Sequence, residues 1–147
     1  MLLTTLATDV LLEIYGYLDL IDAINLSQTC VRLRDVAQLH FKRYKTFNLE
    51  NFIHDQEQAK RRNRIDVSTV VKHIGAFVSF LVVDLDESRI GSNLAKTIRK
   101  YCVNVKSLRI DAGGNRHKGC RCTYYSEWLK NLKLEKITLE ESYLRSE

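Results

Sequence analysis

Four side chains late in the sequence are of the types that could hold a metal ion. His117, Cys120 and Cys122 form H-x-x-C-x-C within the glycine-rich stretch 111-DAGGNRHKGCRC-122, and Cys102 supplies a fourth soft ligand. Zinc prefers such ligands, but the two-residue gap usual between paired zinc cysteines is missing. We therefore interpret the stretch as a polar loop and predict no bound metal.

No set of residues has the spacing of a catalytic centre. Gly113 and Gly114 lack the remaining glycines of a nucleotide-binding loop. None of the histidines lies in a known catalytic motif, so no nucleophile, base and orienting group stand out. The four histidines are His40, His54, His73 and His117. We predict that the chain is not an enzyme and holds no cofactor.

Charge is unevenly distributed along the chain, which bears on the kind of partner. The chain carries 23 Lys and Arg against 18 Asp and Glu, a net charge of +5, yet residues 1–40 are net negative. Residues 96–121 hold eight basic side chains against Asp111, and 60-KRRNR-64 is a second basic run. A basic half favours an acidic partner. Nucleic acid is the alternative, although no nucleic-acid-binding motif is present.

Length and composition are those of a globular protein with one domain, or with a small module joined to a short second one. Of its 147 residues, 45% are hydrophobic and 28% are charged. The longest strongly apolar stretch, 73–83, is too short to span a bilayer, which needs about 20 residues. The N-terminus lacks the basic region of a signal peptide, and the four cysteines are expected to be reduced thiols. We predict a cytoplasmic or nuclear location without a membrane partner.

The first forty residues have the pattern of three short helices, which are the first elements that could position a functional site. Thr8 and Asp19 are the expected N-caps, and Asp22 completes a weak capping box at the second helix. In the first helix, apolar residues recur at helical spacing at Leu6, Val10, Leu11, Ile14, Tyr15 and Leu18. Because these exceed what one small core needs, the surplus is expected to pack against another chain or against the rest of this one.

The stretch 6-LATDVLLEIYGYLDLIDAINLSQTCVRLRDVA-37 resembles an F-box, in the same order and without a gap. The matching residues are Leu6, Val10, Leu11, Ile14, Tyr15, Tyr17, Leu18, Asp19, Leu26, Ser27, Cys30 and Arg32. Ala7 replaces the usual proline and Leu33 the common tryptophan. The first change loosens the helix start and the second removes contact area, so both are expected to lower partner affinity.

The resemblance implies a module that docks on the Skp-type adaptor of cullin–RING ubiquitin ligases of the SCF class. Apolar side chains that lose water at the interface would provide the affinity. The positions that the resemblance implies for this contact are Leu6, Val10, Leu11, Ile14, Tyr15, Leu18, Leu20 and Ile24.

Residues 44–147 contain a repeated apolar pattern with helix-like stretches between its copies. The pattern apolar-x-x-apolar-x-apolar starts at Tyr44, Val78, Val105 and Leu134, and the polar run 54–66 is interpreted as an insertion. The last two intervals are within the range of leucine-rich repeats, which the segment resembles in an irregular form. The pattern predicts strands near 44–49, 78–84, 105–110 and 134–139, and helices over Val67–Ala76, Asn93–Cys102 and Tyr124–Leu132.

Together these features predict an α+β or α/β chain with two parts. A three-helix F-box occupies residues 1–43, and a short solenoid of strand–helix units with a parallel sheet occupies 44–147. A small α/β domain with coincidental spacing is the alternative for the second part. The resemblance implies a non-catalytic receptor subunit whose repeats hold a target protein for ubiquitination and proteasomal degradation. We assign target contact to Arg99, Arg109 and Arg116.

Alternatives stay open for the last strand and for the function. The last strand would be an exposed edge of a parallel sheet, so either a partner covers it or the chain is a shortened form that competes for the adaptor. A ligase-independent scaffold that binds the adaptor is one alternative function. A basic module that binds nucleic acid is the other.

Overall fold

The computed structural model describes residues 2–58, 65–84, 92–112 and 132–141. The chain divides into two compact units, residues 1–44 and 45–147. The sequence predicts this boundary one residue earlier. Each unit is described below by itself.

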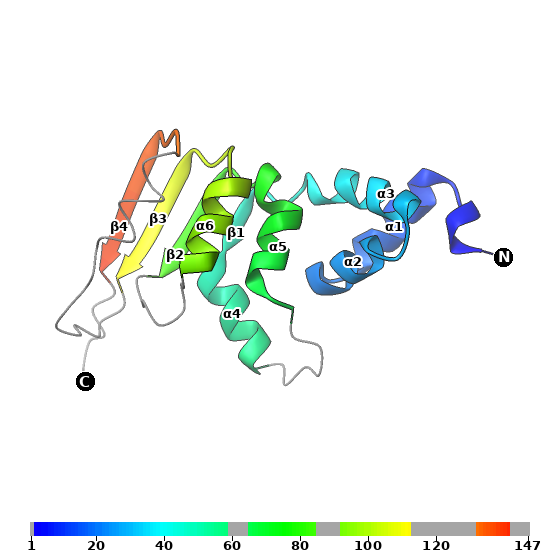
Figure 1. The fold of residues 1–147 in the computed structure, drawn as a ribbon, viewed down its shortest axis with the longest axis horizontal. Coiled ribbons are helices and arrows are strands. Elements are labelled where there is room, and N and C mark those ends of the chain that lie inside the picture. The colour runs from blue at the N-terminus through cyan, green and yellow to red at the C-terminus, as the bar shows by residue number, and fades with distance from the viewer. Residues whose placement is uncertain (1, 59–64, 85–91, 113–131, 142–147) are drawn as a thin grey trace. The chain divides into compact units, whose positions relative to one another are not determined.

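Unit 1 consists of short helices, in agreement with the helical N-terminus that the sequence predicts (Figure 1). Its elements are the 3-10 helix η1 (Leu3–Thr5) and the α-helices α1 (Thr8–Tyr17), α2 (Leu20–Ser27) and α3 (Val31–Phe41). Asp19 caps α2 as expected, since its carboxylate accepts a hydrogen bond of 2.8 Å from the Asp22 N–H. At α1 the expected cap is wrong by one residue, because Ala7 is the N-cap and Thr8 begins the helix.

Tyr15 connects α1 to α3 inside unit 1. Its ring is fully buried, and its hydroxyl donates a hydrogen bond of 3.0 Å to the carbonyl oxygen of Leu33. Burial raises the pKa of Tyr15 to about 12, so the hydroxyl keeps its proton at all physiological pH values. The other large, fully buried side chains of the unit are Leu11, Ile24 and Phe41. These residues are the core that α1, α2 and α3 share.

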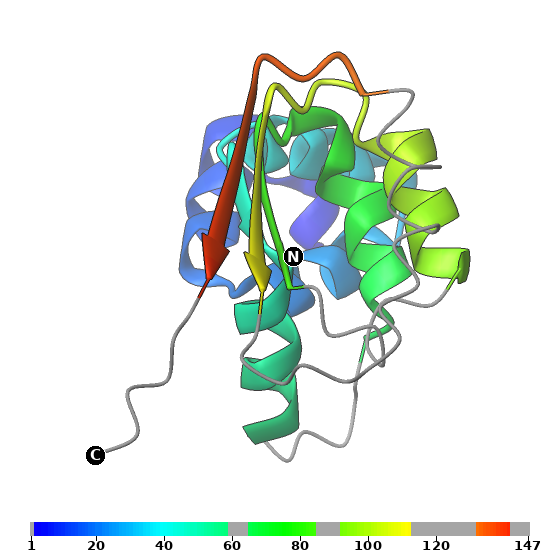
Figure 2. The ribbon, with the colours of Figure 1, turned by 90° about the vertical axis from the view of Figure 1, so that its left-hand side faces the viewer.

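The described residues of unit 2 contain a four-stranded, fully parallel sheet with the strand order β1-β2-β3-β4, which is also the order in the sequence. The elements are β1 (Thr46–Asn48), α4 (Leu49–Gln58), α5 (Val67–Ile74), η2 (Gly75–Phe77), β2 (Phe80–Asp84), α6 (Ser92–Tyr101), β3 (Ser107–Ala112) and β4 (Lys136–Glu141). In Figure 2 the sheet is seen nearly edge-on, with α5 and α6 on one of its faces. The predicted parallel sheet with helices is therefore confirmed.

The strand register explains the apolar pattern of the sequence. Phe47, Leu81 and Leu108 occupy the same register position on β1, β2 and β3, and all three are buried. Val83 and Ile110 form the next buried row. Each predicted strand overlaps an observed strand. The apolar pattern indicates strands because alternate residues of a strand face the same core.

The structure differs from the predicted polar insertion and leaves most of the last predicted helix undescribed. The structure forms α4 over Leu49–Gln58, so the first part of the run 54–66 is helical. The Asn48 side chain begins this helix by accepting a 3.0 Å hydrogen bond from the Asn51 N–H. The predicted helix Tyr124–Leu132 lies, except for its last residue, outside the described residues.

Gly75, the first residue of η2, lies close to the end of α6. A Cβ atom at this position would lie 3.1 Å from the carbonyl carbon of Tyr101 and 3.2 Å from the Sγ of Cys102. The first neighbour is backbone and cannot rotate away, so only glycine fits here without a shift of α6.

We therefore predict that Gly75→Ala lowers the free energy of unfolding by about 1–3 kcal/mol, the usual cost of overpacking a core. Gly16→Ala is the control, since no atom lies within 4 Å of the position that its Cβ would take. Alanine at that exposed helical site is expected to raise the free energy of unfolding by about 0.5 kcal/mol. Urea unfolding followed by circular dichroism measures both. Equal effects of the two substitutions would contradict the close approach at Gly75.

Candidate functional site

Unit 1 leaves many large apolar side chains on its surface for so small a unit. Their exposed fractions reach 84% at Tyr17 and 65% at Val31. The set is Leu2, Leu3, Val10, Tyr17, Val31 and Leu39. Scattered apolar side chains are ordinary on a protein surface, but a contiguous group of them marks an interaction site.

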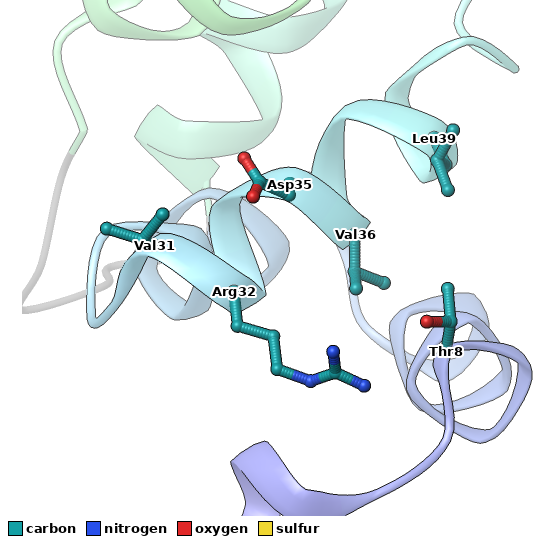
Figure 3. Close-up of a pocket in the computed structure, with 6 residues that line it drawn as sticks. All are labelled: Thr8, Val31, Arg32, Asp35, Val36 and Leu39. Carbon is teal, nitrogen blue, oxygen red and sulfur yellow. The ribbon is translucent and has the colours of Figure 1, made fainter.

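A cleft of about 490 Å³ brings part of this set together (Figure 3). It lies between the start of α1 and the length of α3, and its lining residues are Thr8, Val31, Arg32, Asp35, Val36 and Leu39. In Figure 3 the side chains of Thr8, Val36 and Leu39 point into the same space. The cleft is therefore mainly apolar, with one cation and one anion from α3.

Arg32 holds one end of this cleft in place. Its Nη2 donates a hydrogen bond of 2.7 Å to the carbonyl oxygen of Leu6, in the segment before α1. This bond ties the first turn of α3 to a residue 26 positions earlier in the sequence. An apolar cleft with a fixed wall suits the side chains of a protein partner, because a partner's apolar residues can fill it and lose water.

The structure places the eight predicted adaptor-contact residues at three depths. Leu11, Tyr15 and Ile24 are buried in the core of unit 1. Val10 is exposed, with 42% of its surface accessible. The half-buried residues are Leu6, Ile14, Leu18 and Leu20. The eight residues therefore form a core and a surface layer above it, and their contact with an adaptor stays a prediction.

The sequence pattern does not predict the part of the surface that α3 supplies. Val31 and Leu39 are both exposed and both line the cleft, but neither is among the predicted contact residues. Their separation by eight residues, with Asp35 midway, places them along one side of a helix. This spacing is a signal for a second surface beside the buried stripe of Leu33, Val36 and Phe41, and Val36 borders both.

His40 is a buried histidine beneath the surface of unit 1. Its ring centroid lies 5.5 Å from that of Tyr15, 6.0 Å from that of Phe41 and 5.9 Å from that of Tyr44. Its Nε2 is buried and has no hydrogen-bond partner among the described residues. Burial first, and then the nearby charge of Arg43, lower the pKa of His40 below its ordinary value of 6.5. The core of unit 1 is therefore built for the neutral form of this ring.

Of the three predicted target-contact arginines, the structure describes Arg99 and Arg109, which lie on different elements. Arg99 is exposed in the last turn of α6. Arg109 lies on β3, where its guanidinium is 3.2 Å from the Glu140 carboxylate of β4. Since it alternates with the buried Leu108 and Ile110, its side chain faces the opposite side of the sheet from them. Arg116 lies outside the described residues.

The stretch with the possible metal ligands also falls largely outside the described residues, which include only Cys102 of the four. Cys102 is buried, and its burial raises the thiol pKa to about 12. A protonated, enclosed thiol of this kind packs as a small apolar side chain. Within the described ranges no three His, Cys, Asp or Glu residues group as metal ligands, and no helix is long and apolar enough to cross a bilayer.

Comparison with known proteins identifies unit 1. The family model of the F-box domain matches residues 3–44, which spans the three helices, the cleft and His40. No curated protein matches the chain. The predicted F-box is therefore confirmed as a domain at residues 3–44, and the family match does not extend to the segment that follows.

The environment of His40 predicts how the stability of the F-box domain depends on pH. Because folding lowers the pKa of His40 below 6.5, the unfolded chain binds this proton more readily, and unfolding is favoured as the pH falls below 6.5. We predict that the wild type loses more thermal stability between about pH 7.5 and pH 5.5 than His40→Phe does.

Circular dichroism melts of the full-length wild type and variant at both pH values test this. Comparing the two proteins cancels the contribution of carboxylates that titrate in the same range. An equal loss of melting temperature in both would show that His40 remains free to take up a proton in the folded domain.

Proposed function

We propose that the chain is a substrate-receptor subunit of an SCF-type ubiquitin ligase, and that it takes no part in the chemistry itself. The observation that carries the proposal is the F-box match over residues 3–44, together with the apolar cleft on the same unit. F-box domains in general bind Skp-type adaptors, which connect them to a cullin. Ubiquitin transfer then depends on the other subunits, and the receptor acts by holding the target near them.

The proposed adaptor surface combines the exposed residues of two helices. Val10 on α1 and Val31 and Leu39 on α3 supply apolar area that is accessible in the free domain. The half-buried residues Leu6 and Ile14 extend this area. The buried core residues support this surface only through the fold. Substitution of a core residue would therefore first unfold the domain. Exposed positions are therefore the informative ones for mutation.

The proposed role of residues 45–147 is to hold the target. The strands follow one another in sequence order, all parallel, and α5 and α6 lie on one face of the sheet. This arrangement supports the proposal of irregular leucine-rich repeats, since each strand–helix unit of a solenoid packs only on its neighbours. The basic side chains of residues 96–121 favour an acidic target surface.

Nucleic acid is a weaker candidate partner for this half of the chain. Lys106 lies 3.0 Å from the Glu135 carboxylate, and Arg109 lies 3.2 Å from that of Glu140. Each pair reduces the positive charge that a phosphate backbone would meet. An acidic protein surface, which recognises charge and shape together, is therefore the partner that we propose.

The adaptor proposal predicts a loss of binding when charge is placed on the exposed apolar surface. Val10→Asp and Leu39→Asp are each expected to weaken binding to a purified Skp-type adaptor about tenfold or more, because a buried carboxylate at an interface has no partner. Val103→Asp is the matched control, since Val103 is 63% exposed but lies in unit 2.

Biolayer interferometry with the full chain gives the dissociation constants, and circular dichroism checks that each variant is folded. The proposal is wrong if folded Val10→Asp and Leu39→Asp bind the adaptor as tightly as Val103→Asp does. It is equally wrong if the wild type does not bind the adaptor.

The target proposal predicts that charge reversal in the basic segment removes bound proteins selectively. The double variant Arg99→Glu, Arg116→Glu is expected to keep adaptor and cullin but to lose a set of acidic proteins in quantitative affinity purification from cells. Arg109 is left intact because its partner Glu140 joins β3 to β4. An unchanged set of bound proteins would contradict a basic target surface.

A further inference from the structure

The outer edge of β4 presents backbone groups in a defined pattern. In the described part of the chain, β4 pairs only with β3 and is the last strand of the sheet. The Lys136 N–H donates a 3.1 Å hydrogen bond to the carbonyl oxygen of Lys106, so Lys136, Thr138 and Glu140 direct their backbone groups toward β3. Ile137 and Leu139 therefore direct theirs outward, because successive residues of a strand alternate.

The side chains of β4 separate by chemistry between the two faces of the sheet. Ile137 is in register with the buried Leu108, and Leu139 with the buried Ile110. Yet 54% of the surface of Ile137 and 71% of that of Leu139 is exposed. Lys136, Thr138 and Glu140 lie on the opposite face. The edge thus carries an apolar pair on one face and a cation and an anion on the other.

We propose that β4 pairs antiparallel with β4 of a second copy of this chain, about a two-fold axis through Thr138. In this register Lys136 of each copy lies opposite Glu140 of the other, and Ile137 lies opposite Leu139. The segment 136-KITLE-140 is therefore complementary to itself when reversed. Closed two-fold contacts of this kind use the same surface on both partners.

Backbone geometry limits the pairing to few registers, and charge selects one of them. Only residues that point outward can face each other in a hydrogen-bonded pair, so the axis passes through a residue of β4. Axes through Lys136, Glu140 or Glu141 set like charges against each other, which leaves Ile137, Thr138 and Leu139. An axis through Ile137 places Leu139 opposite Glu135, and one through Leu139 places Ile137 opposite Glu141. Both registers set an apolar side chain against a carboxylate. The axis through Thr138 alone matches apolar with apolar and opposite charges with each other.

The dimer would join the two sheets into one. The two pairs of Ile137 and Leu139 would each exchange two N–H···O bonds across the axis. Because the axis is perpendicular to the sheet, the core-side faces of both copies stay on the same side, and the four apolar side chains pack as one cluster. Glu140 can keep its contact with Arg109, since a carboxylate offers two oxygens. The pairing also removes an open edge, which otherwise promotes aggregation.

The experiment uses two single charge variants of the full chain, alone and mixed. Lys136→Glu sets a second carboxylate against Glu140, and Glu140→Lys sets a second ammonium group against Lys136, so each variant alone repels its own copy. When the two are mixed, one variant supplies carboxylates at both positions and the other supplies ammonium groups, so every cross-strand pair again joins opposite charges. Lys133→Glu is the control, since it makes the same charge change at an exposed residue before β4.

Sedimentation velocity over a range of concentrations is the readout. We expect the wild type and Lys133→Glu to approach twice the 17.1 kDa mass of the chain as concentration rises. Lys136→Glu and Glu140→Lys are each expected to stay monomeric, and their equimolar mixture to regain the wild-type dimer. Leu139→Pro, which removes an outward N–H without breaking a bond to β3, is expected to stay monomeric as well.

Three results would overturn the pairing. The first is a wild type that stays monomeric throughout, and the second is self-association of both charge variants at the wild-type level. The third is a mixture of the variants that remains monomeric while circular dichroism shows both to be folded. Rescue by mixing separates the proposed register from general damage to the sheet, because a damaged strand would not regain pairing with another damaged strand.

Discussion

Burial of Tyr15 is the interaction on which the F-box domain depends. A unit of this size buries little apolar area, so each large side chain in its core carries a high share of the stability. The Tyr15 ring fills the space between α1 and α3, and its hydroxyl satisfies the carbonyl oxygen of Leu33. The ring of His40 packs against Tyr15, which brings an ionisable group into the same core. The cluster of Tyr15 and His40 therefore stabilises the fold and also determines how its stability responds to pH.

The surface of the domain follows from this small core. Once its few large buried side chains, such as Leu11 and Phe41, have filled it, the remaining apolar side chains have no interior to enter. Val31 and Leu39 are left along α3, where they border the cleft with Thr8 of α1. An apolar surface that the domain cannot cover by itself is what a docking module offers to a partner. The small core thus explains why apolar side chains remain exposed, and this exposed surface supports the proposed docking function.

A similar constraint applies to the sheet of the second unit. Parallel strands need helices to cover their faces and neighbours to satisfy their edges. Leu108 and Ile110 of β3 are buried, whereas their register partners Ile137 and Leu139 on β4 are exposed. The proposed pairing of two β4 strands satisfies both the backbone and the side chains at this edge. It requires no adaptor and no target, so it is independent of the proposed ligase role.

The sequence predicts most of the secondary structure because apolar spacing encodes it directly. The positions of α1 to α3 and of the four strands follow from residues such as Leu11, Leu81 and Leu108, whose periodicity matches their burial. The pattern does not predict α4, because the second half of this helix is polar and resembles an insertion. The apolar pattern also does not predict how deeply a residue is buried, since a helical stripe does not distinguish core residues such as Ile24 from exposed ones such as Val10. That distinction depends on how neighbouring helices pack, which no local pattern specifies.

The proposed function requires that the F-box domain connect this chain to a cullin through an adaptor. The decisive experiment is to mix the purified chain, a Skp-type adaptor and the adaptor-binding part of a cullin, and to measure the mass of the assembly by size-exclusion chromatography with light scattering. We expect one peak that contains all three proteins in equal amounts. A chain that elutes apart from a formed adaptor–cullin complex would contradict the proposed function. A complex of chain and adaptor that excludes the cullin would instead identify a ligase-independent scaffold.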